Sequence, residues 1–155
     1  MSNFLRDVRE DVLERDRIYL PRETLERHDV PVEQIEDLEY DEAFAAAVRD
    51  ELRRTEALYR EGVAGINLLP RDCQLPVLTA AVLYADHHRL IRERDCDVLS
   101  VTPSLSTSRK VRLVVETRWN WFWNKDPETV FAKVSAVPSG SSTSHDRPGE
   151  PLPAR

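Results

Sequence analysis

Two aspartates near the start of the chain, Asp7 and Asp11, are four residues apart in a stretch rich in acids and arginines, "NFLRDVREDVLERDRIYLP". On a helix this spacing places both carboxylates on one face, about one turn apart. Two such carboxylates suit Mg²⁺, a hard cation that takes few protein oxygens and completes its octahedron with phosphate and water. Arg6 and Arg9 are close in sequence and suit diphosphate charge that the metal leaves unneutralised.

The alternative is a solvated helix face on which acids and arginines form pairs, each worth about 0.2–0.5 kcal/mol. Asp37 and Asp41 in "DLEYD" have the same spacing, and nothing around them suggests a site. The spacing alone is therefore weak evidence for a metal site. The flanking residues are needed to distinguish such a site from a solvated helix face.

The elements that position these aspartates are predicted to be helices. Residues 3–16 carry an apolar stripe of period 3.6, which predicts one amphipathic helix ended by Pro21. Two short helical pieces follow, each opened by a proline, over 22–30 and 31–38. Asp41 is expected to cap a long helix through residue 66, on which Phe44 and Val48 share one face.

The second half of the chain continues the helical pattern. "NLLPRDCQLP" predicts a break over 67–76, and residues 77–95 predict the most buried helix. Residues 98–108 are expected to form a loop, and 109–124 another helix. Asp126 and Pro127 are typical of the N-cap and first position of a last helix.

Composition favours one all-α domain over residues 1–136, with 41% hydrophobic and 32% charged residues in a chain of 155. Residues 137–155 are rich in proline, serine and glycine and are expected to form a disordered tail. The net charge of −6 argues against a nucleic-acid partner. Cys73 and Cys96 predict free thiols, and no apolar run reaches the length of a membrane span, so a cytoplasmic location is expected.

Other groups are weaker candidates. His87 and His88 are adjacent and, with Asp86, are predicted to lie on a helix surface rather than in a metal site. "RWNWFWN" places Trp119 and Trp123 on one helix face and Trp121 elsewhere. Core packing is the favoured interpretation of these tryptophans, and an interfacial membrane anchor is the alternative.

The pattern "N-x-x-R-D-V-x-E-D" followed by "R-I-Y-L-P" resembles the second aspartate-rich motif of the head-to-head prenyl synthases, the phytoene and squalene synthase family. "EALYREGVAGINLLP" and "AAVLYADHHRLIRERDCDVL" are similar to later helices of that family. The resemblance runs from residue 3 to about residue 134 and leaves only the tail uncovered. The motif positions are Asn3, Arg6, Asp7, Glu10, Asp11, Arg17, Tyr19, Leu20 and Pro21.

The resemblance implies part of an all-α isoprenoid-synthase fold, in which two aspartate motifs face each other and hold Mg²⁺, or Mn²⁺, bound to prenyl diphosphates. It assigns Asp7 and Asp11 as metal ligands. The residues implied to support the diphosphate or line the site are Asn3, Arg6, Arg17, Tyr19 and Tyr84. For each tyrosine the alternative is an ordinary core or rim aromatic.

The family reaction joins two geranylgeranyl diphosphates through a cyclopropyl intermediate, prephytoene diphosphate, to give phytoene for carotenoid synthesis. Squalene-type condensation of farnesyl diphosphate is a related alternative, and a non-catalytic helical interaction module is an alternative from another class. Because substrate and product are lipids, peripheral association with a membrane is an alternative to a purely cytoplasmic location.

The chain departs from the family pattern at three points. Asp16 stands where the family usually has glycine, and Val101 stands where it commonly has arginine. The family's first aspartate motif lies in an N-terminal half that this chain lacks. We therefore expect a separate N-terminal half to complete the site and this chain alone to be inactive.

Overall fold

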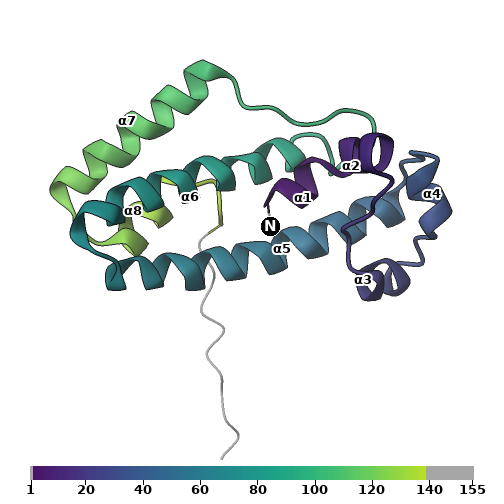
Figure 1. The fold of residues 1–155 in the computed structure, drawn as a ribbon, viewed down its shortest axis with the longest axis horizontal. Coiled ribbons are helices and arrows are strands. Elements are labelled where there is room, and N and C mark those ends of the chain that lie inside the picture. The colour runs from purple at the N-terminus through teal and green to yellow at the C-terminus, as the bar shows by residue number, and fades with distance from the viewer. Residues whose placement is uncertain (1, 139–155) are drawn as a thin grey trace, which may run out of the picture.

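The computed structural model describes residues 2–138, except for the side chains of Ser2 and Asn3, and every regular element in that range is a helix. The predicted all-α class is confirmed. Figure 1 shows a long pair of helices with shorter helices around its two ends. The helices are α1 Ser2–Arg6, α2 Val8–Arg15, α3 Arg22–Arg27, α4 Val32–Glu36, α5 Glu42–Ala64, the 3₁₀ helix η1 Gly65–Leu68, α6 Arg71–Arg92, α7 Thr107–Trp123 and α8 Pro127–Val134.

The long pair consists of α5 and α6, which run antiparallel (Figure 1). Asp41 caps α5 as expected, because its carboxylate accepts a hydrogen bond of 2.8 Å from the backbone N–H of Phe44. Phe44, Val48 and Leu52 recur every four residues and are almost fully buried. This apolar stripe fixes the face of α5 that packs inward.

Helix α6 begins at Arg71, six residues earlier than the sequence indicated, and Pro76 lies inside it. The first four N–H groups of any helix have no intrahelical acceptor. Pro76 lies just beyond this first turn of α6, so its missing N–H removes only one hydrogen bond of the helix. The expected break is confined to η1 and to Leu69 and Pro70. The reversal between α5 and α6 is therefore tight.

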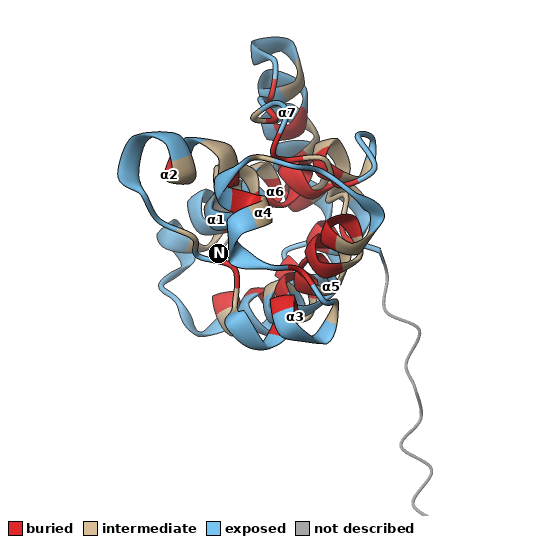
Figure 2. Ribbon diagram, turned by 90° about the vertical axis from the view of Figure 1, so that its right-hand side faces the viewer, coloured by how far each residue is buried: buried red, intermediate tan, exposed pale blue. Residues whose placement is uncertain are grey.

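The buried apolar side chains form two clusters along the α5–α6 pair. The first joins α1 to α4 with the N-terminal half of α5 and the segment after α6. The second joins the C-terminal end of α5 and η1 with α6, α7 and α8. Figure 2 views the first end of the molecule and shows the buried parts of α5 and α6 turned toward the interior.

The predicted single helix over residues 3–16 is wrong, because the chain breaks at Asp7 and forms α1 and α2. Helix α2 ends at Asp16, which adopts the left-handed conformation with φ 51° and ψ 47°. Glycine adopts this conformation at no steric cost, whereas other residues rarely do. Asp16 therefore ends a helix at the position where the resembled family usually has glycine.

The first two residues of the predicted tail, 137 and 138, contact the helical body. Val137 is buried in the second cluster, and the backbone carbonyl of Pro138 accepts a hydrogen bond of 3.1 Å from Arg60. These contacts hold residues 137 and 138 against α5 and the second cluster. Residues 139–155, where most of the predicted tail falls, lie outside the described residues.

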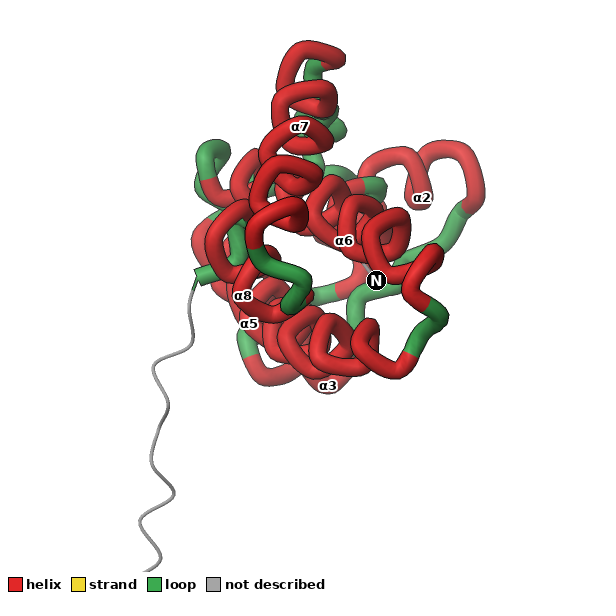
Figure 3. Tube along the Cα trace, turned by 90° about the vertical axis from the view of Figure 1, so that its left-hand side faces the viewer, coloured by secondary structure: helices red, strands yellow, loops and turns green. Residues whose placement is uncertain are grey.

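Helix α7 packs through one face only. Leu113, Thr117 and Trp121 are buried at spacings of four residues, whereas Trp119 and Trp123 are 64% and 71% exposed. Core packing is therefore correct for Trp121 and wrong for the other two tryptophans. Figure 3 shows α7 projecting from the α5–α6–α8 body, with helices and loops as the described elements.

Candidate functional site

Asp7 and Asp11 lie one turn apart at the start of α2, as the spacing predicts. Asp7 is the N-cap residue, and its carbonyl accepts a hydrogen bond of 2.8 Å from the backbone N–H of Asp11. Asp11 is buried and Asp7 is partly buried. Both carboxylates are close to the N-terminus of α2, where negatively charged side chains stabilise a helix.

Each carboxylate is paired with its own arginine. The guanidinium of Arg6 binds Asp7 through Nε and Nη2, with 2.7 Å between Nη2 and Oδ2, and this pairing raises the pKa of Arg6. Arg15 donates to Asp11. Arg9, the other arginine expected near a diphosphate, instead donates to the carbonyl of Leu99 at 2.6 Å.

Tyr19 and Arg17 lie after α2 and fold back toward α1. The Arg17 guanidinium donates to the Tyr19 hydroxyl at 3.3 Å, and the ring of Tyr19 lies 4.8 Å from that of Phe4 on α1, centroid to centroid. Tyr19 is 42% exposed. The structure thus brings Tyr19 beside α1 and Arg17 beside Tyr19, and both residues are exposed. The side chain of Asn3 falls outside the described residues.

Tyr84 lies on α6, which contacts α1, and its side chain is 46% exposed. One turn further along α6, Nε2 of His87 lies 3.4 Å from Nη1 of Arg6. Tyr84 and His87 therefore face the same N-terminal segment that carries Arg6 and Asp7. Sequence reasoning included Tyr84 and missed His87.

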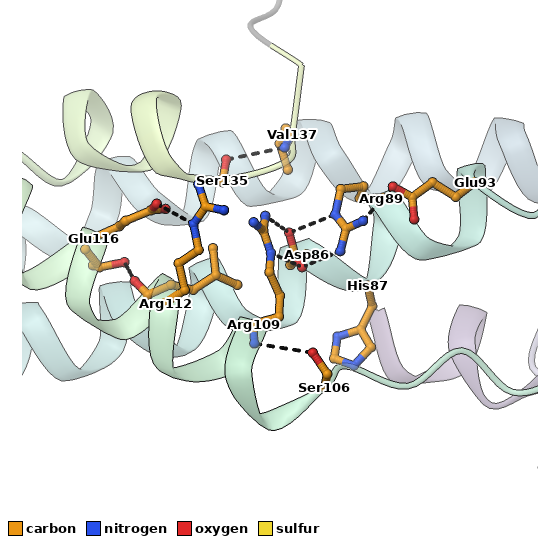
Figure 4. Close-up of polar contacts among 12 residues, drawn as sticks. Asp86, His87, Arg89, Glu93, Ser106, Arg109, Arg112, Glu116, Ser135 and Val137 are labelled. Carbon is orange, nitrogen blue, oxygen red and sulfur yellow. Dashed lines mark hydrogen bonds and ion pairs between the residues drawn. The ribbon is translucent and has the colours of Figure 1, made fainter.

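The predicted surface position of Asp86, His87 and His88 is wrong, because all three are buried. Nδ1 of His88 lies 3.3 Å from the carboxylate of Glu56 on α5. Asp86 binds Arg89 on α6 and Arg109 on α7, and Figure 4 shows both guanidinium groups reaching it while the His87 ring points away. Sequence spacing signals Arg89, three residues from Asp86, but not Glu56 or Arg109, which are 32 and 23 residues from their partners.

The donor set available for a metal ion is two carboxylates. In the part of the chain that the structure describes, no three acidic, histidine or cysteine side chains form a group that could hold a metal. The oxygens of Asp7 and Asp11 nevertheless have the hard character that Mg²⁺ and Mn²⁺ prefer, and Mg²⁺ commonly takes only one or two protein carboxylates alongside substrate phosphates. The residues present therefore fit a shared metal site.

Residues 1–113 match the model of a protein family described as squalene/phytoene synthase. The chain belongs to this family. The match includes α1 to α6 and the first part of α7, and hence every residue assigned to the candidate site.

Within the squalene/phytoene synthase family, the chain is 33% identical over 119 residues to a 15-cis-phytoene synthase of Synechocystis sp., covering 77% of this chain and 35% of the relative. It is 44% identical over 69 residues to a phytoene synthase of Thermus thermophilus, covering 44% and 24%. A phytoene synthase of Cereibacter sphaeroides is 33% identical over 115 residues, covering 74% and 32%. The matches thus span about a quarter to a third of the length of these relatives. No solved structure matches it.

Among the described residues, no helix combines the length and apolarity needed to cross a bilayer.

Proposed function

We propose that the chain supplies one wall of a phytoene synthase active site, which condenses two geranylgeranyl diphosphates head to head through prephytoene diphosphate. The observation that carries this proposal is the placement of Asp7 and Asp11 one turn apart at the start of α2. Arg6 lies between Asp7 and α6, where it contacts His87. The names of the relatives support phytoene as the product.

In this proposal Asp7 and Asp11 hold Mg²⁺, which when bound neutralises the charge of the departing diphosphate. Arg6 presents its guanidinium to the same diphosphate. Loss of diphosphate leaves an allylic cation, which the aromatic faces of Tyr19 and Tyr84 stabilise.

The two aspartates are too few to hold the metal ions of two diphosphates without other oxygens. We therefore propose that a second set of carboxylates, beyond the described residues, completes the site and that this 155-residue chain alone makes no phytoene. The test is incubation with geranylgeranyl diphosphate and Mg²⁺, followed by product extraction. Phytoene from this chain would refute the requirement for a second set.

The substrate class is tested by the same assay on a chimera. In this chimera, residues 1–113 replace the matching segment of a full-length relative. Phytoene from geranylgeranyl diphosphate is the expected product. Squalene from farnesyl diphosphate instead would assign the related reaction. A folded chimera that makes neither product, beside an active parent, would favour a non-catalytic helical module.

We also propose that the exposed face of α7 rests on anionic membranes. Trp119 and Phe122 line a depression of about 640 Å³ together with three basic side chains, Arg71, Arg118 and Lys125, and one acid, Asp72. Aromatic rings surrounded by basic groups complement the boundary between acyl chains and anionic headgroups. A surface of this kind would keep the site close to lipid substrates.

A further inference from the structure

The contact between α6 and the N-terminal segment passes through His87, a buried histidine that the proposed reaction does not use. His87 is 7% exposed, and each of its ring nitrogens lies within hydrogen-bonding distance of a polar group. Nε2 is 3.4 Å from Nη1 of Arg6, and Nδ1 is 3.2 Å from the backbone carbonyl of Tyr84. These two neighbours determine where the ring proton lies.

A guanidinium can only donate hydrogen bonds, so Nε2 must accept from Arg6. A carbonyl can only accept, so Nδ1 must carry the proton and donate to Tyr84. One neutral tautomer meets both requirements, whereas the other tautomer and the charged ring place an N–H against the guanidinium. Burial, together with the charge of Arg6, holds the pKa of His87 below its ordinary value, in keeping with a neutral ring.

The guanidinium of Arg6 is divided between two partners. Its Nε and Nη2 edge faces the carboxylate of Asp7, and Nη1 faces His87. If Asp7 turns to a metal ion, the Nε and Nη2 edge is released while Nη1 keeps its acceptor. The freed edge has the fork geometry that binds two oxygens of a phosphate group.

We propose that His87 is a positioning residue, which as the Nδ1-protonated tautomer keeps Arg6 at the site when Asp7 binds the metal. This inference rests on the proposed function of Asp7 and Arg6 as metal and diphosphate ligands. His87 itself touches neither ligand, so its effect is carried by Arg6.

The first test needs no ligand. Long-range ¹H–¹⁵N spectra of the 155-residue chain at neutral pH, with His87→Gln to assign the signals, are expected to show protonated Nδ1 and unprotonated Nε2 for His87. A charged ring, or a proton on Nε2, would overturn the inference. A thermal cycle of Arg6→Met, His87→Leu and the double variant adds a second ligand-free readout. We expect non-additive changes in melting temperature, and additivity would count against the contact.

The second test titrates the Mn²⁺-loaded chain with inorganic diphosphate by calorimetry. His87→Leu removes the acceptor and is expected to weaken diphosphate binding about threefold to tenfold, the range for one lost hydrogen bond. His87→Gln keeps an acceptor oxygen at this reach and is expected to restore binding to within about twofold. His88→Gln, a buried histidine whose partner is Glu56, is the matched control and should not weaken binding.

The outcomes separate the two proposals. Equal diphosphate affinity in the parent, His87→Leu and His87→Gln would refute positioning by His87. A parent chain that binds neither Mn²⁺ nor diphosphate would instead refute the proposed ligand roles of Asp7 and Arg6, and the inference would fall with them even if the tautomer were as expected.

Discussion

Arg109 on α7 binds Asp86 on α6 through two parallel hydrogen bonds, of 2.8 Å from Nη2 and 3.1 Å from Nε. Arg89 donates to the same carboxylate from α6 itself. Asp86 is buried and both guanidinium groups are about a third exposed or less. This bidentate pair fixes α7 against the helix that carries Tyr84 and His87.

Replacing Asp86 with asparagine should destabilise the chain at neutral pH. The variant leaves two partly buried guanidinium groups without their carboxylate. We expect the free energy of unfolding to fall by about 2–3 kcal/mol. This is at the low end of the cost of breaking a buried ion pair, because both arginines reach solvent. Urea denaturation followed by circular dichroism measures it. Glu116→Gln, which breaks the exposed pair with Arg112, is the control and should cost about 0.5 kcal/mol or less.

The contribution of Asp86 should also depend on pH. Burial alone would raise the pKa of Asp86, but hydrogen bonds from Arg109 and Arg89 outweigh it and bring this pKa below the ordinary value of 3.8. A carboxylate with a lowered pKa in the folded state stabilises above the unfolded pKa, and this stabilisation is lost as the pH falls through the folded pKa. The stability difference between the parent and Asp86→Asn should therefore be constant from about pH 7 to 5 and shrink below about pH 4. A difference that grows on acidification would contradict the assignment.

Asp7→Asn and Asp11→Asn should each weaken Mn²⁺ binding by roughly tenfold or more, because each removes one charged oxygen ligand. Electron paramagnetic resonance of free Mn²⁺ during titration gives the affinity. Asp37→Asn is the matched control: this residue has the same spacing to Asp41 but lies at the exposed end of α4, while Asp41 caps α5. Equal loss in all three variants would show a non-specific charge effect.

Asp16→Gly should stabilise α2. The residue has φ 51°, and glycine removes the steric cost of that conformation at the helix end, partly offset by the greater freedom of glycine in the unfolded chain. We expect a gain of about 0.5 kcal/mol, seen as a higher melting temperature. Glu14→Gly, inside the same helix, is the opposite control and should cost about 1 kcal/mol. A destabilised Asp16→Gly would indicate that the aspartate side chain has a role of its own.

Binding to vesicles tests the exposed face of α7. Tryptophan emission should shift to the blue with vesicles of phosphatidylcholine and phosphatidylglycerol, less so at high salt, and little with phosphatidylcholine alone. The Trp119→Ser, Trp123→Ser double variant should lose cosedimentation with the vesicles. Leu68→Ser, which replaces an 89% exposed leucine of η1, should retain it. Equal binding of the double variant would exclude this face as the contact.

Local signals in the sequence predicted much of the fold. Asp41 and Asp126 accept backbone hydrogen bonds at the starts of α5 and α8, and Pro127 opens α8, because capping depends only on residues three or four positions away. The spacing of Asp7 and Asp11 likewise predicted that they lie one turn apart, although the break that makes Asp7 the N-cap of α2 was not predicted. These features need no knowledge of the rest of the chain.

Burial was harder to predict because it depends on distant partners. The sequence predicts a surface position for His88 and Asp86. In the structure His88 is buried beside Glu56 of α5, and Asp86 is buried beside Arg109 of α7. The reverse holds for Trp119 and Trp123, whose apolar rings predicted a core position that no described element provides. A polar side chain can be buried where a side chain of another helix forms a hydrogen bond or ion pair with it. The hydrophobic periodicity of one helix carries no information about such contacts.

The two hydrophobic clusters have no side chain in common, although α5 and α6 pass through both. The two ends of the molecule are therefore joined through α5 and α6 rather than through one continuous apolar core. We expect amide hydrogen exchange to show two separately opening units, one around α1–α4 and one around α7–α8. The aspartates then belong to a unit that can open and close while the opposite end of the molecule remains folded.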